Sequence, residues 1–316
     1  MKDTSVPPTV GSQLEDVYER LRPLMFSIAY RMLGSVSEAE DVVQEAYLRL
    51  HRAVTQAGTT IESPKAFLTT VTTRLAIDAL RAARARHETY VGVWLPEPLL
   101  TGAEPDPAEH AEMNESLSFA FLVLLRSLSP VERAVFLLRE VFDYGYDEIA
   151  EIVRKSEENC RQIFARARKR IEAGKPRFDA DHRAQQELAV KFFDAASRGD
   201  MTSLVNFLAE DAIFYGDGGG KAHAYPQPIY GRERVRLVLQ SIFKIGRQLN
   251  ATIQFTRING QPGIMSFDAE GRLINVIALD IADGAVQAVR SIVNPDKLAH
   301  LGIPLSDVGR FKSKDA

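Results

Sequence analysis

The sequence predicts a multidomain chain in which two all-α blocks precede an α+β domain. The first observation is length, since 316 residues correspond to two or three domains of ordinary size. The second is that apolar residues recur at spacings of three and four in the first half, the period of amphipathic helices. The third is a change in the last third, where short apolar runs alternate with Asn-Gly and Asp-Gly pairs that indicate strands and tight turns.

The first block begins with a helix that we expect to end near Gly34. Its apolar face consists of Val17, Leu21, Leu24, Ile28 and Met32. Residues 37–40 (SEAE) predict a capping box that opens a second helix, and His51–Glu62 is expected to be a polar loop. Ser63 and Pro64 are typical of N-cap and N1 positions, so a long helix should run from there to about Arg86.

The second block follows residues 91–114, which carry four prolines and are expected to form an extended linker. Residues 129–132 (SPVE) combine a capping box with proline at N1 and predict a strong helix start. Residues 146–153 and 156–172 then predict a helix-turn-helix. Arg154 stands where such turns often have glycine, and a left-handed conformation there would cost about 1 kcal/mol.

The last third predicts an α+β domain with an antiparallel sheet. Two amphipathic helices are expected at 187–197 and 232–249. The four expected strands are 251–258, 263–267, 273–281 and 285–293.

Composition is typical of a globular chain, with 45% hydrophobic and 26% charged residues. No apolar run is long enough to predict a membrane span, and the first 13 residues lack the apolar stretch of a signal peptide. The single cysteine, Cys160, excludes an internal disulfide and a cysteine-cluster metal site. We therefore expect a cytoplasmic protein with no cofactor and no metal.

The net charge of −3 would by itself argue against a nucleic-acid partner. Its distribution is uneven, because residues 91–114 carry five acidic and no basic side chains. Residues 65–90 carry five basic against two acidic side chains, and residues 154–170 carry seven against two. The chain therefore has two local basic regions separated by an acidic segment, and its average charge does not exclude DNA.

Residues 41–50 (DVVQEAYLRL) and 75–81 (LAIDALR) resemble region 2 of bacterial sigma factors. Residues 129–170, which contain the string ARAR near their end, resemble region 4. This order is similar to that of the extracytoplasmic-function (ECF) class, which retains only these two regions. The resemblance implies a promoter-specificity subunit that binds core RNA polymerase and promoter DNA and is not an enzyme.

Three further strings resemble the ECF subgroup with a fused SnoaL-like (NTF2-like) domain, a cone-shaped fold with a pocket. They are 94–98 (WLPEP), 217–221 (DGGGK) and 294–298 (NPDKL). The resemblance implies regulation in cis by that domain. The implied boundaries are a region 2 domain at 1–90, an acidic linker at 91–114, a region 4 domain at 115–178, a SnoaL-like domain at 184–300 and a tail at 301–316.

The polar face of the second helix is the candidate surface for core RNA polymerase. It consists of Asp41, Gln44, Glu45 and Arg49. On the pattern alone a solvated helix face is the simpler interpretation. The resemblance instead implies contact with the largest polymerase subunit.

The candidate DNA contacts lie in both blocks. Arg74, Arg81, Arg84 and Arg86 are expected to neutralise phosphates near the −10 element. The resemblance implies that the loop at 51–62 captures a flipped base, without assigning the residue. In the recognition helix the base-edge candidates are Glu157, Glu158, Asn159, Arg161 and Gln162, and the phosphate candidates are Arg166, Lys169 and Arg170. The alternative is a surface helix with ion pairs between successive turns.

The candidate regulatory contacts between domains come from the three strings. They are Trp94, Pro96, Pro98, Asp217, Gly218, Gly219, Gly220, Lys221, Asn294, Pro295, Asp296 and Lys297. A packing anchor at Trp94 and an ordinary C-terminal cap at 294–298 are the alternatives. The three glycines indicate positive φ or a close approach of backbone.

Two other functions stay open at this point. A helix-turn-helix regulator that works without polymerase would need only residues 129–170. A polyketide-cyclase-like enzyme with a DNA-binding appendage would need convergent acid and base groups, for which the candidates are Tyr215, Asp217, Lys221, His223 and Tyr225. The free protein is expected to be a monomer that does not bind membranes, and its C-terminal pocket has room for an unknown small ligand.

Overall fold

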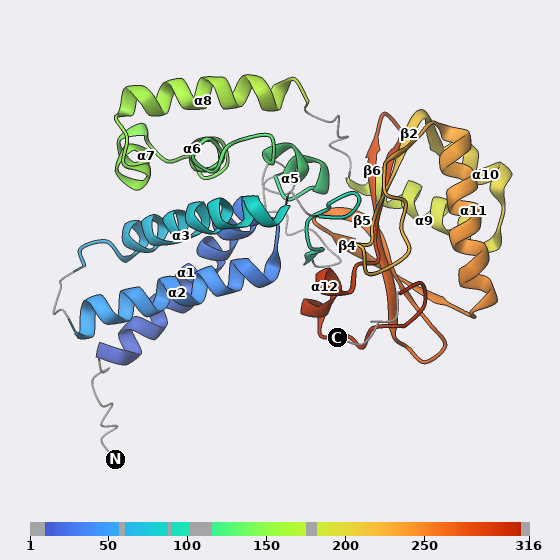
Figure 1. The fold of residues 1–316 in the computed structure, drawn as a ribbon, viewed down its shortest axis with the longest axis horizontal. Helices are drawn as coiled ribbons and strands as arrows, with labels where there is room; N and C mark the ends of the chain where they lie inside the picture. The colour runs from blue at the N-terminus through green and yellow to red at the C-terminus, as the bar shows by residue number, and fades with distance from the viewer. Residues whose placement is uncertain (1–9, 57–60, 88–89, 102–115, 175–181, 311–316) are drawn as a thin grey trace, which may run out of the picture. The chain divides into compact units, whose positions relative to one another are not determined.

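The computed structural model describes the chain except for residues 1–9, 57–60, 88–89, 102–115, 175–181 and 311–316 (Figure 1). The chain divides into two compact units. Unit 1 comprises residues 1–85 and 125–173, and unit 2 comprises residues 86–124 and 174–316. The two helical blocks therefore form one unit, while the segment between them belongs with the C-terminal sequence.

Unit 1 is helical in both of its segments. The first segment contains α1 (Val10–Leu33), α2 (Val36–Thr55) and most of α3 (Pro64–His87). Its core includes Met25, Val43, Ala46, Leu50 and Leu68, all less than 9% exposed. Of the apolar face expected for α1, Ile28 and Met32 are buried and Val17, Leu21 and Leu24 are half-buried.

The start and end of α2 differ from the sequence expectation. The N-cap is Ser35 rather than Ser37, and its hydroxyl accepts a hydrogen bond from the Glu38 N–H at 3.1 Å. The reason is that Gly34 takes φ 70° and ends α1, so Ser35 is the first residue with extended backbone. At its other end α2 continues to Thr55, well into the segment expected to be a loop.

The second segment of unit 1 contains the helix-turn-helix. It consists of α6 (Pro130–Glu140), α7 (Tyr146–Val153) and α8 (Glu157–Glu172). The capping box at Ser129 and Glu132 is present with both of its hydrogen bonds. Arg154 has φ 54° and ψ 54°, so the left-handed turn residue is confirmed. Cys160 and Ile163 of α8 are buried against α6 and α7.

Unit 2 is built on a seven-stranded sheet in the order β1-β4-β5-β6-β7-β2-β3. The strands are β1 (Leu100–Thr101), β2 (Leu208–Asp217), β3 (Ile229–Tyr230), β4 (Thr252–Ile258), β5 (Gln261–Phe267), β6 (Leu273–Ala282) and β7 (Ala285–Ile292). The four expected strands are confirmed. The sheet is mixed rather than wholly antiparallel, because the unexpected strand β2 pairs in parallel with β7.

Both faces of this sheet are covered. Figure 1 shows α9 (His182–Arg198), α10 (Met201–Phe207) and α11 (Arg232–Gln248) on one side of it. Ile277 and Leu279 of β6 face the core under these helices, while Val276 and Ala278 face the other core. That second core also contains Leu95, from the segment between the helical blocks. The α+β class is therefore confirmed, with side chains alternating between two cores.

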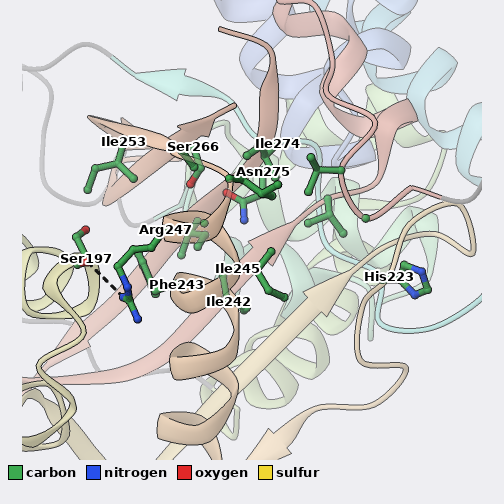
Figure 2. A pocket seen from close by; sticks show the side chains of 17 residues that line it. Ser197, His223, Ile242, Phe243, Ile245, Arg247, Ile253, Ser266, Ile274 and Asn275 are labelled. Atoms are coloured by element: carbon green, nitrogen blue, oxygen red, sulfur yellow. Dashed lines mark hydrogen bonds between the residues drawn. The ribbon is translucent and has the colours of Figure 1, made fainter. Parts of the chain in front are cut away.

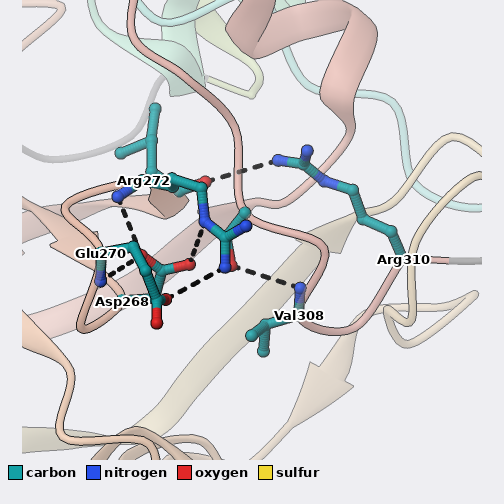
Figure 3. Close-up of polar contacts among 7 residues, drawn as sticks. Asp268, Glu270, Arg272, Val308 and Arg310 are labelled. Carbon is teal, nitrogen blue, oxygen red and sulfur yellow. Dashed lines mark hydrogen bonds and ion pairs between the residues drawn. The ribbon is translucent and has the colours of Figure 1, made fainter.

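The C-terminal residues return to the sheet after α12 (Pro295–Leu298) and the short 3-10 helix η1 (Ala299–Leu301). The Leu273 N–H donates to Pro304 O at 2.8 Å, and the Ser306 N–H donates to Leu273 O at 2.9 Å. Figure 3 shows the same region, where the Arg310 guanidinium donates to Leu273 O. The segment expected to be a tail is thus attached to unit 2 as far as Arg310.

None of the helices in the described part of the chain is long and apolar enough to cross a lipid bilayer.

Candidate functional site

The candidate polymerase surface is a polar face of α2. Asp41, Gln44 and Arg49 are exposed, and Glu45 is half-buried. Arg49 Nε donates to Glu45 Oε1 at 2.8 Å, which fixes part of this face. Leu48 lies beside them with 38% of its surface exposed and adds an apolar contact that the polar pattern did not reveal.

The arginines of α3 differ in what they contact. Arg74 Nε donates to Ile152 O at 2.9 Å and its Nη2 donates to Glu151 O at 2.8 Å, so it binds carbonyls in the last turn of α7. Arg81 is exposed and pairs with Asp78 at 3.2 Å. Arg84 and Arg86 belong to α3, but their side chains lie outside the described ones. Arg81 is thus on the surface, whereas Arg74 holds the two segments of unit 1 together.

The recognition helix α8 presents most of its candidates to solvent. Glu157, Glu158, Arg161, Gln162, Arg166, Lys169 and Arg170 are exposed, and Asn159 is half-buried. Its N-cap Ser156 accepts from the Asn159 N–H at 3.3 Å. Ion pairs along the helix also exist, since Arg161 pairs with Glu157 at 2.7 Å and Arg168 pairs with Glu172 at 2.8 Å. The helix therefore combines the expected exposed face with the ion pairs of the simpler alternative.

The three strings meet in unit 2 around one buried carboxylate. Asp217 is fully buried, and its Oδ2 accepts from the Leu95 N–H at 2.7 Å and from Lys297 Nζ at 2.7 Å. Its Oδ1 accepts from the Tyr90 hydroxyl. Lys297 Nζ also donates to Leu95 O. We call Tyr90, Trp94, Leu95, Asp217, Asn294 and Lys297 the Asp217 cluster.

Aromatic rings enclose the buried ammonium group. Lys297 Nζ lies 4.4 Å from the centroid of the Trp94 ring and 4.7 Å from that of Tyr90, within cation–π range. Burial raises the pKa of Tyr90, and the neighbouring Asp217 carboxylate raises it further, so this phenol stays protonated as a donor. Trp94 is therefore a packing anchor that contacts the C-terminal domain through Lys297.

The glycines allow this close packing. A Cβ atom at Gly218 would lie 2.3 Å from Ala222 O, and one at Gly219 would lie 2.1 Å from Asn294 Nδ2. Gly219 and Gly220 also have positive φ, at 58° and 73°. Both features predicted for the glycines, positive φ and close approach, are present.

The remaining residues of the three strings make other contacts within unit 2. Lys221 pairs with Asp296 on the surface at 2.6 Å. Asn294 Nδ2 donates to the Tyr90 hydroxyl at 3.0 Å, and Pro295 occupies the first turn of α12. Pro96 and Pro98 are buried on unit 2. Tyr90 was not identified from the sequence, because it follows a helix end and belongs to none of the strings.

The candidate acid and base groups do not converge. Asp217 is bound by three donors within its cluster, and Tyr215 lies under the Arg290 guanidinium, 4.5 Å from its ring centroid. His223 and Tyr225 line a cavity whose walls include neither Asp217 nor Tyr215. Among the described residues no group of three or more His, Cys, Asp or Glu side chains is arranged to hold a metal ion. This arrangement does not favour an enzyme.

Family profiles match both segments of unit 1. Residues 17–86 match "Sigma-70 region 2", and residues 118–171 match "Sigma-70, region 4".

Two curated relatives match most of the chain. The ECF RNA polymerase sigma factor SigJ of Mycobacterium tuberculosis is 36% identical over 301 residues, covering 92% of this chain and 94% of the relative. The probable ECF RNA polymerase sigma factor SigI of the same organism is 28% identical, covering 88% and 92%. The crystal structure of M. tuberculosis SigJ aligns with a TM-score of 0.70 and 33% identity, over 92% of this chain and all of that one.

Proposed function

The chain belongs to the extracytoplasmic-function family of RNA polymerase sigma factors, and we propose that its C-terminal domain regulates its activity through the Asp217 cluster. Its two sigma regions imply binding to core RNA polymerase and to promoter DNA. In this proposal the exposed face of α2 (Asp41, Gln44, Glu45 and Arg49) contacts the polymerase, and α8 reads the −35 element in the major groove.

The observation that carries the regulatory part is where the segment between the sigma regions is bound. Leu95 and Trp94 belong to the Asp217 cluster, and Leu100 and Thr101 pair with β4 as the edge strand β1. Residues 90–101 would span about 40 Å when fully extended, at roughly 3.3 Å per residue. While they are bound to unit 2, this length is not available to the linker that joins the two sigma regions. Release of this segment would make that length available to the linker again.

Contacts within unit 1 also hold the two sigma regions against each other. Arg74 of region 2 bonds to α7 of region 4, and Thr69 Oγ1 lies 2.9 Å from the Tyr144 hydroxyl. The −10 and −35 elements are about 25 base pairs apart, or roughly 85 Å along B-DNA at 3.4 Å per base pair. Helices in hydrogen-bond contact do not reach both elements, so initiation requires the two segments of unit 1 to separate. We propose that the Asp217 cluster restrains this separation.

The test is run-off transcription with purified core RNA polymerase on a promoter from the gene's own locus. The variant Lys297→Met removes the cation paired with Asp217 and leaves the buried carboxylate without its counter-ion. We expect it to give several-fold more transcript than the unaltered protein. The matched control is Lys221→Met, which removes an exposed ion pair with Asp296 and should leave the yield unchanged.

An unchanged or reduced yield from Lys297→Met would contradict the restraint. A second outcome concerns the polymerase-independent regulator. If the protein binds the promoter equally well with and without core polymerase, then the polymerase contact proposed for α2 is wrong.

A further inference from the structure

The sheet of unit 2 holds a cavity outside the Asp217 cluster. It has a volume of about 290 Å³ and lies between the second half of α11 and the sheet (Figure 2). Its walls are mainly apolar and include Ile242, Phe243, Ile253 and Ile277. An adjoining cavity of about 340 Å³ shares Ile242, Ile245 and Asn275 with the first.

Asn275 is a buried polar side chain of these walls whose amide oxygen has no protein partner. The residue is 6% exposed, and no protein donor lies within hydrogen-bond distance of its buried Oδ1. It lines both cavities, and Figure 2 shows its amide between Ser266 and the α11 residues Ile242 and Ile245. A buried amide oxygen without a donor destabilises the folded protein, and a bound donor would recover that cost.

Two other polar groups of the wall, Arg247 and Ser197, already have partners within the protein. Arg247 Nη1 donates to Ala196 O at 3.2 Å and to Ser197 O at 3.3 Å. Ser197 Oγ donates to Phe193 O at 2.7 Å. The guanidinium is therefore committed to the end of α9. A charged ligand would find no dedicated counter-ion from these two groups, so the cavity favours a neutral one.

We propose that this cavity binds a small neutral molecule of one or two fused apolar rings that carries a hydroxyl group, and that the hydroxyl donates to Asn275 Oδ1. The size follows from the volume, because an apolar cavity of roughly 150 Å³ in another protein accommodates benzene. A cavity of about 290 Å³ accommodates two fused rings. Apolar walls with one placed polar group are typical of small-molecule sites.

The cavity also adjoins the Asp217 cluster along the chain. Val293 lines both cavities, and its N–H donates to Asp217 O at 2.9 Å. The next residue, Asn294, donates from its N–H to the same oxygen at 3.1 Å. A molecule in the cavity would thus contact a residue bonded directly to the cluster. The binding site itself does not depend on the proposed regulation.

The experiment is isothermal titration calorimetry of the full chain with two probes, the second of which carries a methyl group in place of the hydroxyl hydrogen of the first. 1-Naphthol is a two-ring molecule with a hydroxyl donor, and 1-methoxynaphthalene has the same rings without the donor. We expect saturable binding of 1-naphthol with one molecule per chain. We expect it to bind at least about 5-fold tighter than 1-methoxynaphthalene, as one hydrogen bond at a buried site predicts.

Asn275→Leu keeps a side chain of similar size and removes the acceptor. It should bind both probes equally and should unfold at a higher temperature than the unaltered protein in their absence. The matched control is Thr72→Val in α3, which also removes a buried oxygen without a protein partner and should leave both affinities unchanged.

Absence of saturable binding, or equal affinity of the unaltered protein for the two probes, would overturn the proposal. So would a preference for 1-naphthol that survives Asn275→Leu. Each readout is a binding heat of the free protein, so a failure of the transcription experiment leaves this test unaffected.

Discussion

Replacing Lys297 with methionine should destabilise unit 2 more than any single surface change. Lys297 is 7% exposed, and its ammonium group donates to Asp217, which is fully buried. Methionine retains the length of the side chain but neither the charge nor the donors. The carboxylate would keep the Leu95 N–H and the Tyr90 hydroxyl as donors and would lose its counter-ion.

The expected loss is about 3–5 kcal/mol, the usual cost of removing one partner from a buried ion pair. The two cation–π contacts with Trp94 and Tyr90 contribute within this range, at about 0.5–2 kcal/mol each. The second replacement, Asp217→Asn, should restore most of the loss, because an amide needs no counter-ion. The free energies of unfolding of the two single variants and the double variant form a cycle that isolates the coupling between the charges.

The assay is chemical unfolding of the full chain followed by tryptophan fluorescence. Trp94 is the one tryptophan of the sequence, and its ring lies against Lys297, so the signal reports directly on the cluster. A loss below about 1 kcal/mol for Lys297→Met, or a double variant as unstable as the sum of the single ones, would refute the electrostatic account of this site.

Three further predictions concern other surfaces. Arg74→Met removes both bonds to the α7 carbonyls and should weaken the contact between α3 and α7 by about 1–2 kcal/mol, seen as roughly 5- to 30-fold faster amide hydrogen exchange in α7. Arg81→Met, on the exposed side of α3, should not change that exchange. Arg161→Ala should relax discrimination at one base pair of the −35 element by about 1–3 kcal/mol in run-off transcription on promoter variants, whereas Arg168→Ala, which also loses an ion pair within α8, should not. Burial alone would raise the pKa of Asp268, but hydrogen bonds from Ser306 and Arg272 outweigh it and lower the pKa to about 2. Because the folded pKa lies below the unfolded value of about 3.9, the stability contributed by Asp268 is present above pH 4 and is lost as the pH falls towards 2. Asp268→Asn should reduce the fall in the free energy of unfolding between pH 4 and pH 2. An unchanged fall over that interval would contradict this assignment.

Local patterns predicted most of the helices, because several of them begin at a capping residue and carry an apolar face. Ser129 with Glu132 and the spacing from Val131 onward are sufficient to start α6. The N-cap of α2 was misplaced by two residues, because Ser35 and Ser37 are both acceptable caps and only the φ of Gly34 decides between them. The helix-turn-helix and the left-handed Arg154 followed from the turn chemistry alone.

The strand β2 was missed because its alternation is interrupted. Glu210 and Asp211 are adjacent and both exposed, and the pairing with β7 shifts register between Leu208 and Ile213. A period of two is lost across such an irregularity, so the run does not read as a strand. Its partner is more than 70 residues away, and a parallel pairing at that distance leaves no local signal.

The Asp217 cluster shows a different limit. The three strings were identified separately, and each contains residues that no local rule explains, such as the glycines at 218–220. What the sequence did not supply was the pairing of Asp217 with Lys297, which lie 80 residues apart, or the participation of Tyr90. Long-range electrostatic pairing depends on burial, and burial here is created by the fold itself.

A buried ion pair is well suited to a contact that must be released as a unit. Removing only Lys297 leaves a charge in an apolar site, and this accounts for the large loss expected from the single variant. Opening the whole cluster instead returns Asp217 and Lys297 to water together, so both recover their hydration. The free energy of opening is therefore a difference between the lost ion pair and the recovered hydration, and a competing interaction with the open form can shift it. The segment at 90–101 would then be held while the cluster is intact and released as a unit when polymerase or promoter DNA binds better to the open form.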